Sequence, residues 1–168
     1  MKQFKTLLLA TALCIGTFSF TQAQSKVAHI NTQELISAMP EMKAAQKELE
    51  NLSKTYQTDM QASITEYQTT VKQYDAEAAT KTAEENAIRA QELQGKQQRL
   101  QQFEVDARKD IESKQAELIQ PITEKAKAAI LKVGRAQGYE YVLDSSLGVT
   151  ILADGKNLLD DVKKELGI

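Results

Sequence analysis

The sequence predicts an α+β protein that is mainly α, in which a long antiparallel helical hairpin (a coiled-coil arm, residues 41–119) is inserted into a small β-containing body. Apolar or small residues recur at helical spacing through the arm, whereas every β-branched run that suits a strand lies in the flanking stretches 24–40 and 120–168. These stretches total about 65 residues, and a body of that size buries only about 60% of its unfolded surface. We therefore expect neighbouring subunits to complete it, as an oligomerisation body.

The first residues have the plan of a secretory signal peptide, residues 1–23. Lys2 and Lys5 precede an apolar run from Leu7 to Phe20, and cleavage is expected after Ala23. The alternative is an uncleaved membrane anchor, but the run is shorter than the ~20 residues that a spanning helix needs. The only cysteine, Cys14, lies inside this run after Thr-Ala-Leu, so neither lipid attachment nor a disulfide in the mature chain is expected.

The mature chain begins with a short strand followed by a helical turn. The β-branched run Lys26–Asn31 suits a strand, and Asn31 can cap a helix with Glu34 reaching back to its free amide. Pro40 interrupts this turn but suits the first turn of a new helix. The outward helix of the arm is therefore expected to begin at Pro40 or Glu41 and to run to about Ala79.

The two halves of the arm differ in the quality of their apolar seams. Seam positions of the outward half are spaced 3.67 residues apart on average, which implies a nearly straight helix. They are Ala45, Leu49, Leu52, Tyr56, Met60, Ile64, Tyr67, Val71, Tyr74 and Ala78. The return half has Leu93, Leu100, Phe103, Ala107, Ile111 and Leu118, with Gln97 and Gln115 expected to fill polar gaps. Because this seam is thin, we expect the arm to open locally between about Val71 and Leu100.

The tip of the hairpin is expected at Thr80-Lys-Thr82, where Thr82 and Glu85 form a possible capping box. Neither glycine nor proline marks this turn, so one continuous helix over residues 40–120 remains an alternative. The hairpin is favoured because its halves have similar lengths and their seams can face each other. Gly95 lowers helix propensity by about 1 kcal/mol relative to alanine and is a candidate flexing point.

The C-terminal stretch is expected to supply most of the sheet. Pro121 falls within the returning apolar rhythm, so it predicts a kink or junction in a helix that ends near Gly138. Tyr139–Asp144 and Val149–Leu152 are expected to pair as a β-hairpin, joined by the first strand, and Asn157 to cap a last helix. The residues expected to mediate oligomerisation are Val27, Ile30, Val142, Leu143, Val149 and Ile151.

The motifs of catalysis and cofactor binding are absent from the sequence. It has no glycine-rich phosphate loop, no Gly-x-Ser-x-Gly and no histidine cluster, and His29 is expected to be a strand histidine with ordinary hydrogen bonding. Consecutive carboxylates, as at Glu84-Glu85 and Asp160-Asp161, diverge by about 100° on a helix and are usually solvated. The mature chain has 19 basic and 23 acidic residues. We therefore expect no enzyme activity, no cofactor, no metal and no nucleic-acid partner.

Several segments in a fixed order carry a resemblance. They are Lys-Val-Ala-His-Ile-Asn, Asn-Thr-Gln-Glu-Leu-Ile, Met-Pro-Glu, the arm, Gly-Tyr-Glu-Tyr-Val-Leu-Asp and the tail Leu-Leu-Asp-Asp-Val-Lys-Lys-Glu-Leu. In this order they resemble the Skp/OmpH family of periplasmic chaperones over essentially the whole mature chain. The resemblance implies a periplasmic homotrimer of jellyfish-like architecture, whose three arms enclose a cavity. It also implies an ATP-independent holdase that binds unfolded outer-membrane proteins and prevents their aggregation.

The arm departs from the family in its charge. The best-known members are strongly basic, but residues 41–118 hold 11 basic and 15 acidic residues, so no lipopolysaccharide site is carried over. Arm residues expected at the seam or facing clients are Tyr56, Met60, Tyr67, Tyr74, Leu93, Leu100 and Phe103, the tyrosines being favoured as seam residues. The alternative function is a structural coiled-coil spacer or tether of the cell envelope. That function would favour a longer heptad array or an attachment motif.

Overall fold

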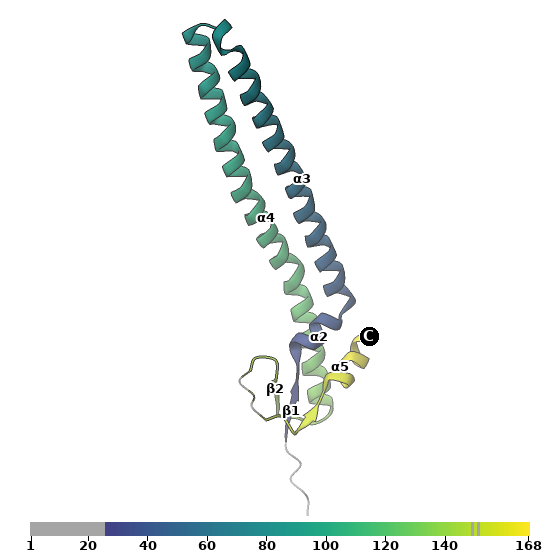
Figure 1. Cartoon of the computed structure of the whole chain (residues 1–168). Coiled ribbons are helices and arrows are strands. Elements are labelled where there is room, and N and C mark those ends of the chain that lie inside the picture. Colours follow the sequence, from purple (N-terminus) through teal and green to yellow (C-terminus); the bar gives the residue numbers. More distant parts are fainter. Residues whose placement is uncertain (1–25, 149, 151) are drawn as a thin grey trace, which may run out of the picture.

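The computed structural model describes residues 26–148, 150 and 152–168, so the expected signal peptide lies outside the described residues. A long arm of two antiparallel helices projects from a small body (Figure 1). The elements in order are β1 (Val27–Ile30), α2 (Thr32–Ala38), α3 (Pro40–Glu77), the 3₁₀ turn η1 (Ala78–Thr80), α4 (Ala83–Ala136), β2 (Tyr141–Asp144), β3 (Lys156–Asn157) and α5 (Leu159–Leu166). This confirms the predicted mainly helical α+β fold with a hairpin arm.

The expected helix starts are set by the expected caps. The Asn31 side chain accepts a hydrogen bond from the Glu34 amide at 3.0 Å, and Pro40 stands in the first turn of α3. At the tip, Thr82 and Glu85 form both hydrogen bonds of a capping box, at 2.9 and 3.1 Å. The chain therefore reverses between Glu77 and Ala83, which excludes the single continuous helix.

Helix α4 belongs to both the arm and the body. Pro121 lies inside it and does not end it, and the helix continues to Ala136 (Figure 1). Its last part packs on the sheet, where Gly134 permits a close approach to β2. An added Cβ at Gly134 would stand only 3.0 Å from a methyl group of Val142. The return helix of the arm and the main helix of the body are thus one element.

The sheet differs from the expected β-hairpin. Its order is β2-β1-β3, and both outer strands run parallel to the central strand β1. Val149 and Ile151 lie outside the described residues, while Thr150 and Leu152 are not in a strand. The third strand is instead Lys156–Asn157, and the Asn157 side chain still accepts from the Leu159 amide at the start of α5.

Serine residues that were expected to form the hairpin turn extend the parallel pairing instead. The Ser145 amide donates to the Ile30 carbonyl at 2.9 Å, which prolongs the β1–β2 ladder beyond Asp144. The Ser146 amide and hydroxyl both donate to the Asp144 carboxylate, at 2.9 and 2.7 Å. With these bonds, the described residues that follow Asp144 do not form an antiparallel partner of β2.

The core is a single cluster at the junction of the arm and the body. It is drawn from β1, α2, α5, the first turns of α3 and the last half of α4, so Met42 and Ala45 of the arm's base also contribute. Its buried members are Ala28, Ile30, Leu35, Met39, Met42, Ala45, Ile122, Ala126, Ala129, Val133, Leu158, Leu159 and Val162. Beyond this cluster the arm has only the seam between its two helices.

Asp144 ties the end of β2 to the start of α2. Its carboxylate accepts from the Thr32 hydroxyl at 2.6 Å and the Thr32 amide at 3.3 Å, besides the two bonds from Ser146. Partial burial alone would raise the pKa of the Asp144 carboxyl, but these hydrogen bonds outweigh it and hold the pKa below its ordinary value. The ionised form of Asp144 therefore stabilises the fold.

The return seam uses lysines where glutamines were expected. Gln97 and Gln115 are exposed, whereas Lys96 and Lys114, one residue earlier, are half-buried at the seam. Lys96 pairs with Glu66 at 2.6 Å and Lys114 with Glu48 at 3.3 Å, both across the arm. A lysine can cover apolar surface with its methylenes while its ammonium group reaches solvent, so each fills a seam position and bridges the helices.

Replacing Asp144 by alanine should lower the free energy of unfolding by about 1–3 kcal/mol, because the donors of Thr32 and Ser146 lose a charged acceptor. Asp154→Ala, at an exposed aspartate of the same connection, is the matched control. Since the folded pKa lies below the unfolded one, the contribution is complete above about pH 4 and is lost as the pH falls through the folded pKa. Urea unfolding curves of wild type and Asp144→Ala should therefore converge in acid. A pH-independent difference would contradict this assignment.

Gly95→Ala should stabilise the arm by about 1 kcal/mol, because an added Cβ meets nothing within 4 Å and alanine has the higher helix propensity. Amide hydrogen exchange should slow around Gly95, and Ala90→Gly, at an exposed position of the same helix, should speed it nearby. Gln97→Leu should add no stability, since Gln97 does not face the seam. Unchanged exchange in Gly95→Ala would show that this glycine does not soften the arm.

Candidate functional site

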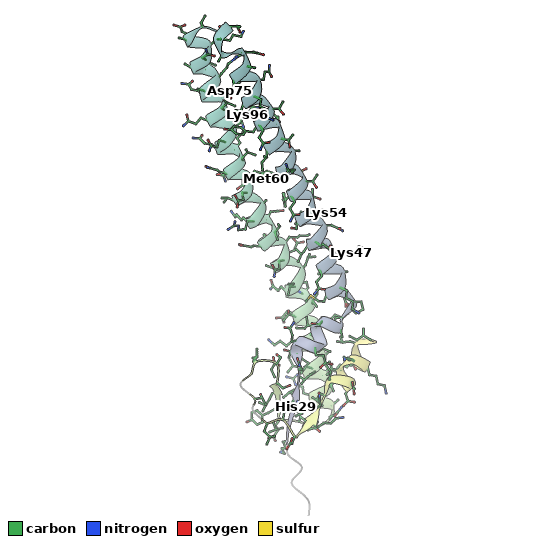
Figure 2. All side chains as sticks on the ribbon, viewed as in Figure 1. His29, Lys47, Lys54, Met60, Asp75 and Lys96 are labelled. Atoms are coloured by element: carbon green, nitrogen blue, oxygen red, sulfur yellow. The ribbon has the colours of Figure 1, made fainter. Side chains whose placement is uncertain are left out.

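The middle of the arm carries an apolar groove between α3 and α4. Its volume is about 670 Å³. Met60, one of its lining residues, lies midway along the arm (Figure 2). The lining residues are Ser53, Tyr56, Gln57, Met60, Gln61, Phe103, Glu104, Ala107, Arg108, Ile111 and Glu112. We call this the mid-arm groove. Its apolar side chains come from the seam and its polar side chains from the adjoining helix faces.

Tyr56 joins the two helices at the mid-arm groove. Its hydroxyl donates to the Asp110 carboxylate at 2.7 Å, and its ring meets Phe103 edge to face with centroids 5.8 Å apart. The hydrogen bond to Asp110 raises the pKa of Tyr56. The phenol therefore stays neutral and keeps its ring in the seam as one wall of the groove.

Above the mid-arm groove the helices are joined by Lys96 and Glu66. Their hydrogen bond raises the pKa of Lys96 and lowers the pKa of Glu66, so both remain charged near neutral pH. Beside this pair, Tyr67, Leu100 and Phe103 line a smaller hollow of about 220 Å³. The second hollow is thus crossed by an ion pair, whereas the larger one is not.

The tip of the arm is fastened by polar contacts around Tyr74. Its hydroxyl donates to Glu92 at 2.5 Å, which raises the pKa of Tyr74, and the Arg89 guanidinium lies 4.5 Å from its ring centroid. Arg89 also pairs with Glu77 on the opposite helix. Tyr74 therefore serves to join the helices. The local opening of the arm between Val71 and Leu100 stays a prediction. The contacts around Tyr74 would resist such an opening.

The seven arm residues singled out in the sequence are all half-buried along the interhelix seam. Tyr56, Met60 and Phe103 meet at the mid-arm groove, and Tyr67, Leu100 and Phe103 at the smaller hollow. Ala107 and Ile111 complete the groove floor and were identified only as seam residues. Its polar residues, such as Arg108 and Glu112, carry no periodic signal that would have marked them.

A second surface is the outward face of the sheet. Ala28 and Ile30 point into the core, so Val27 and His29 point outward, as do their register partners Tyr141 and Leu143. Tyr141 is 64% exposed and Leu143 47%, and Leu147 and Leu152 of the following connection are also exposed. This outward sheet face is an uncovered apolar surface on a small body.

Two sequence expectations about the body need correction. Ile30 is only 1% exposed and belongs to the chain's own core, so it is not available to a second subunit. Val142 also packs against that core, although it is only half-buried. The Nδ1 atom of His29, which was expected to have ordinary hydrogen bonding, is buried without a hydrogen-bond partner among the described residues. Val149 and Ile151, expected at the same interface, lie outside the described residues.

The described part of the chain offers neither a metal site nor a membrane span. No group of His, Cys, Asp or Glu side chains within it could hold a metal ion. None of its helices combines the length and the apolar character needed to cross a bilayer. Residues 26–168 hold 19 basic and 23 acidic residues, and the whole acidic excess lies in the arm, because the body (26–40 and 119–168) has 8 basic and 8 acidic residues.

Comparison with known proteins identifies the family. The family model described as outer membrane protein (OmpH-like) matches residues 26–166. A search of curated protein sequences finds no match. Among solved structures, the chain is similar to an OmpH-like protein from Caulobacter crescentus CB15, proposed to be an outer membrane chaperone, with a TM-score of 0.77 and 19% identity over 86% of this chain and 85% of that one. Since this model covers most of the chain, including the arm and the body, the chain belongs to the OmpH-like family.

Proposed function

We propose that this protein is an ATP-independent periplasmic holdase, which encloses unfolded outer-membrane proteins between the arms of an oligomer and prevents their aggregation. The observation that carries the proposal is the arm itself. Helix α3 has 38 residues, which gives a length of about 57 Å at 1.5 Å per residue, and beyond its base, where it also contacts α2, it packs along α4 among the described elements. An arm without a third layer leaves both flanks free to line a space.

The outward sheet face supports association of several copies through the body. Its apolar side chains are Val27, Tyr141 and Leu143, and Leu147 and Leu152 of the following connection are also exposed. A body this small gains most by covering such a face with another copy. Joined bodies would place their arms around a common space. The number three comes from the family resemblance.

The chemistry of the arm supports capture by enclosure and apolar contact. A holdase needs a modest apolar surface and must keep aggregation-prone unfolded chains apart from one another. It needs neither catalysis nor a nucleotide. The mid-arm groove supplies apolar surface, and the acidic excess of the arm keeps assemblies apart in solution. The same acidic excess opposes binding of lipopolysaccharide, whose phosphates are anionic.

The purified mature chain should keep a denatured outer-membrane β-barrel protein in solution when the two are present in stoichiometric amounts, without ATP. Light scattering after dilution of the client from urea measures this, and a soluble protein of similar size and charge serves as control. A spacer or tether of the cell envelope would leave the scattering at the level of that control. Such a result would contradict the proposed function.

Leu143→Glu should dissociate the oligomer, because it puts a charge into the apolar face that a second copy would cover. Analytical ultracentrifugation of the full mature chain measures the change in mass. Val105→Glu, at a residue of the arm that is 61% exposed, is the matched control and should leave the mass unchanged. An oligomer that survives Leu143→Glu but not Val105→Glu would place the subunit contact in the arms.

A further inference from the structure

We propose that the mid-arm groove is a binding subsite for unfolded segments in which aromatic or branched apolar side chains stand next to lysine or arginine. The inference deepens the proposed function and rests on it, because the groove meets unfolded chains only if the protein acts as a chaperone. It names the kind of client segment that the arm prefers. The floor of the groove, the charges at its rim and the charge of the whole arm all favour such a segment.

The floor of the groove is suited to an apolar side chain. Tyr56 and Phe103 stand edge to face at one end, and Met60, Ala107 and Ile111 complete the surface. A volume of about 670 Å³ is within the range of sites that hold small ligands, so one or two side chains of a client fit. Methionine adapts its shape to different partners, which suits a subsite that must accept many sequences.

The rim of the groove is acidic. Its charged residues are Glu104, Arg108 and Glu112, and Arg108 is already paired with Glu104 at 3.2 Å. Glu112 takes part in no ion pair with the described cations. Asp110, the acceptor of the Tyr56 hydroxyl, adds a further negative charge beside the groove wall. A cation next to a bound apolar side chain therefore meets an unpaired carboxylate.

The charge of the arm disfavours two other occupants. A second copy's arm would bring its own excess of four acidic over basic residues against the same excess here. An anionic lipid or fatty acid would be repelled in the same way. An unfolded segment with basic flanks is complementary to both the floor and the rim of the groove.

The test uses three fluorescent peptides with the same aromatic and aliphatic centre, flanked by lysine, by serine or by glutamate. Fluorescence anisotropy with the full mature chain should give a Kd for the lysine peptide at least about threefold lower than for the glutamate peptide, the size expected of exposed charge pairs. This preference should shrink at high salt, where exposed charges are screened. Equal affinities, or tighter binding of the glutamate peptide, would overturn the inference.

Two pairs of variants localise the effect. Ala107→Leu fills the groove and should weaken all three peptides severalfold, whereas Ala90→Leu, at an exposed alanine of the same helix, should not. Glu112→Lys should abolish the preference for lysine flanks, whereas Glu124→Lys, at an exposed position of the same helix within the body, should preserve it. Circular dichroism confirms that each variant remains helical.

The results separate this inference from the proposed function. If the chain suppresses client aggregation but binds the peptides without regard to charge, or with Ala107→Leu unaffected, the holdase survives and the subsite is wrong. If Ala107→Leu changes the mass of the assembly and not peptide affinity, a neighbouring arm occupies the groove, which also overturns the inference. If neither client nor peptide binds, both proposals fail.

Discussion

The parallel pairing of β1 with β2 is the constraint on which the architecture depends. It joins Val27 to Tyr141 and Ile30 to Asp144, and backbone bonds from Glu140 to Lys26 and from Ser145 to Ile30 extend it at both ends. Parallel neighbours cannot be linked by a tight turn, so the chain must leave the sheet and return to the same end. Here that crossover consists of α2, α3 and α4. The arm is thus the long middle part of this crossover, which projects from the body. The base of the arm is therefore positioned by the sheet.

The arm combines contacts that hold its two helices together with hollows that stay open between those contacts. Its helices are held at intervals by interhelix contacts: Glu48 with Lys114, Tyr56 with Asp110, Glu66 with Lys96, and Tyr74 with Glu92. Between these contacts the seam is thin enough to leave hollows, one of them at Met60 and Phe103. A fully apolar seam would close those hollows. A wholly polar one would not hold two helices of this length together.

Features encoded by neighbouring residues were predictable from the sequence, and features that depend on distant partners were not. Asn31, Pro40 and the Thr82–Glu85 box act within one helical turn, so their positions alone predicted the helix starts and the tip. The parallel sheet was missed because Ser145–Gly148 has the composition of a hairpin turn, while its serines bond to residues more than a hundred positions away or to Asp144. Lys96 and Lys114 could not be predicted as seam residues because hydropathy ignores the apolar stem of lysine. The rim of the groove could not be predicted because its charged residues do not recur with a helical period.

The two helices of the arm are attached to the body in different ways. Helix α4 passes from tip to body without a break, whereas α3 meets α2 at a single extended residue, Met39, whose side chain is buried in the core. One helix of the arm thus continues into the body without interruption, whereas the other begins at a break in the helix. Where α4 enters the body, Gly134 packs closely on Val142 of the sheet. Any sideways displacement of the arm along α4 would therefore strain that packing, so the position of the arm and the packing of the body are coupled.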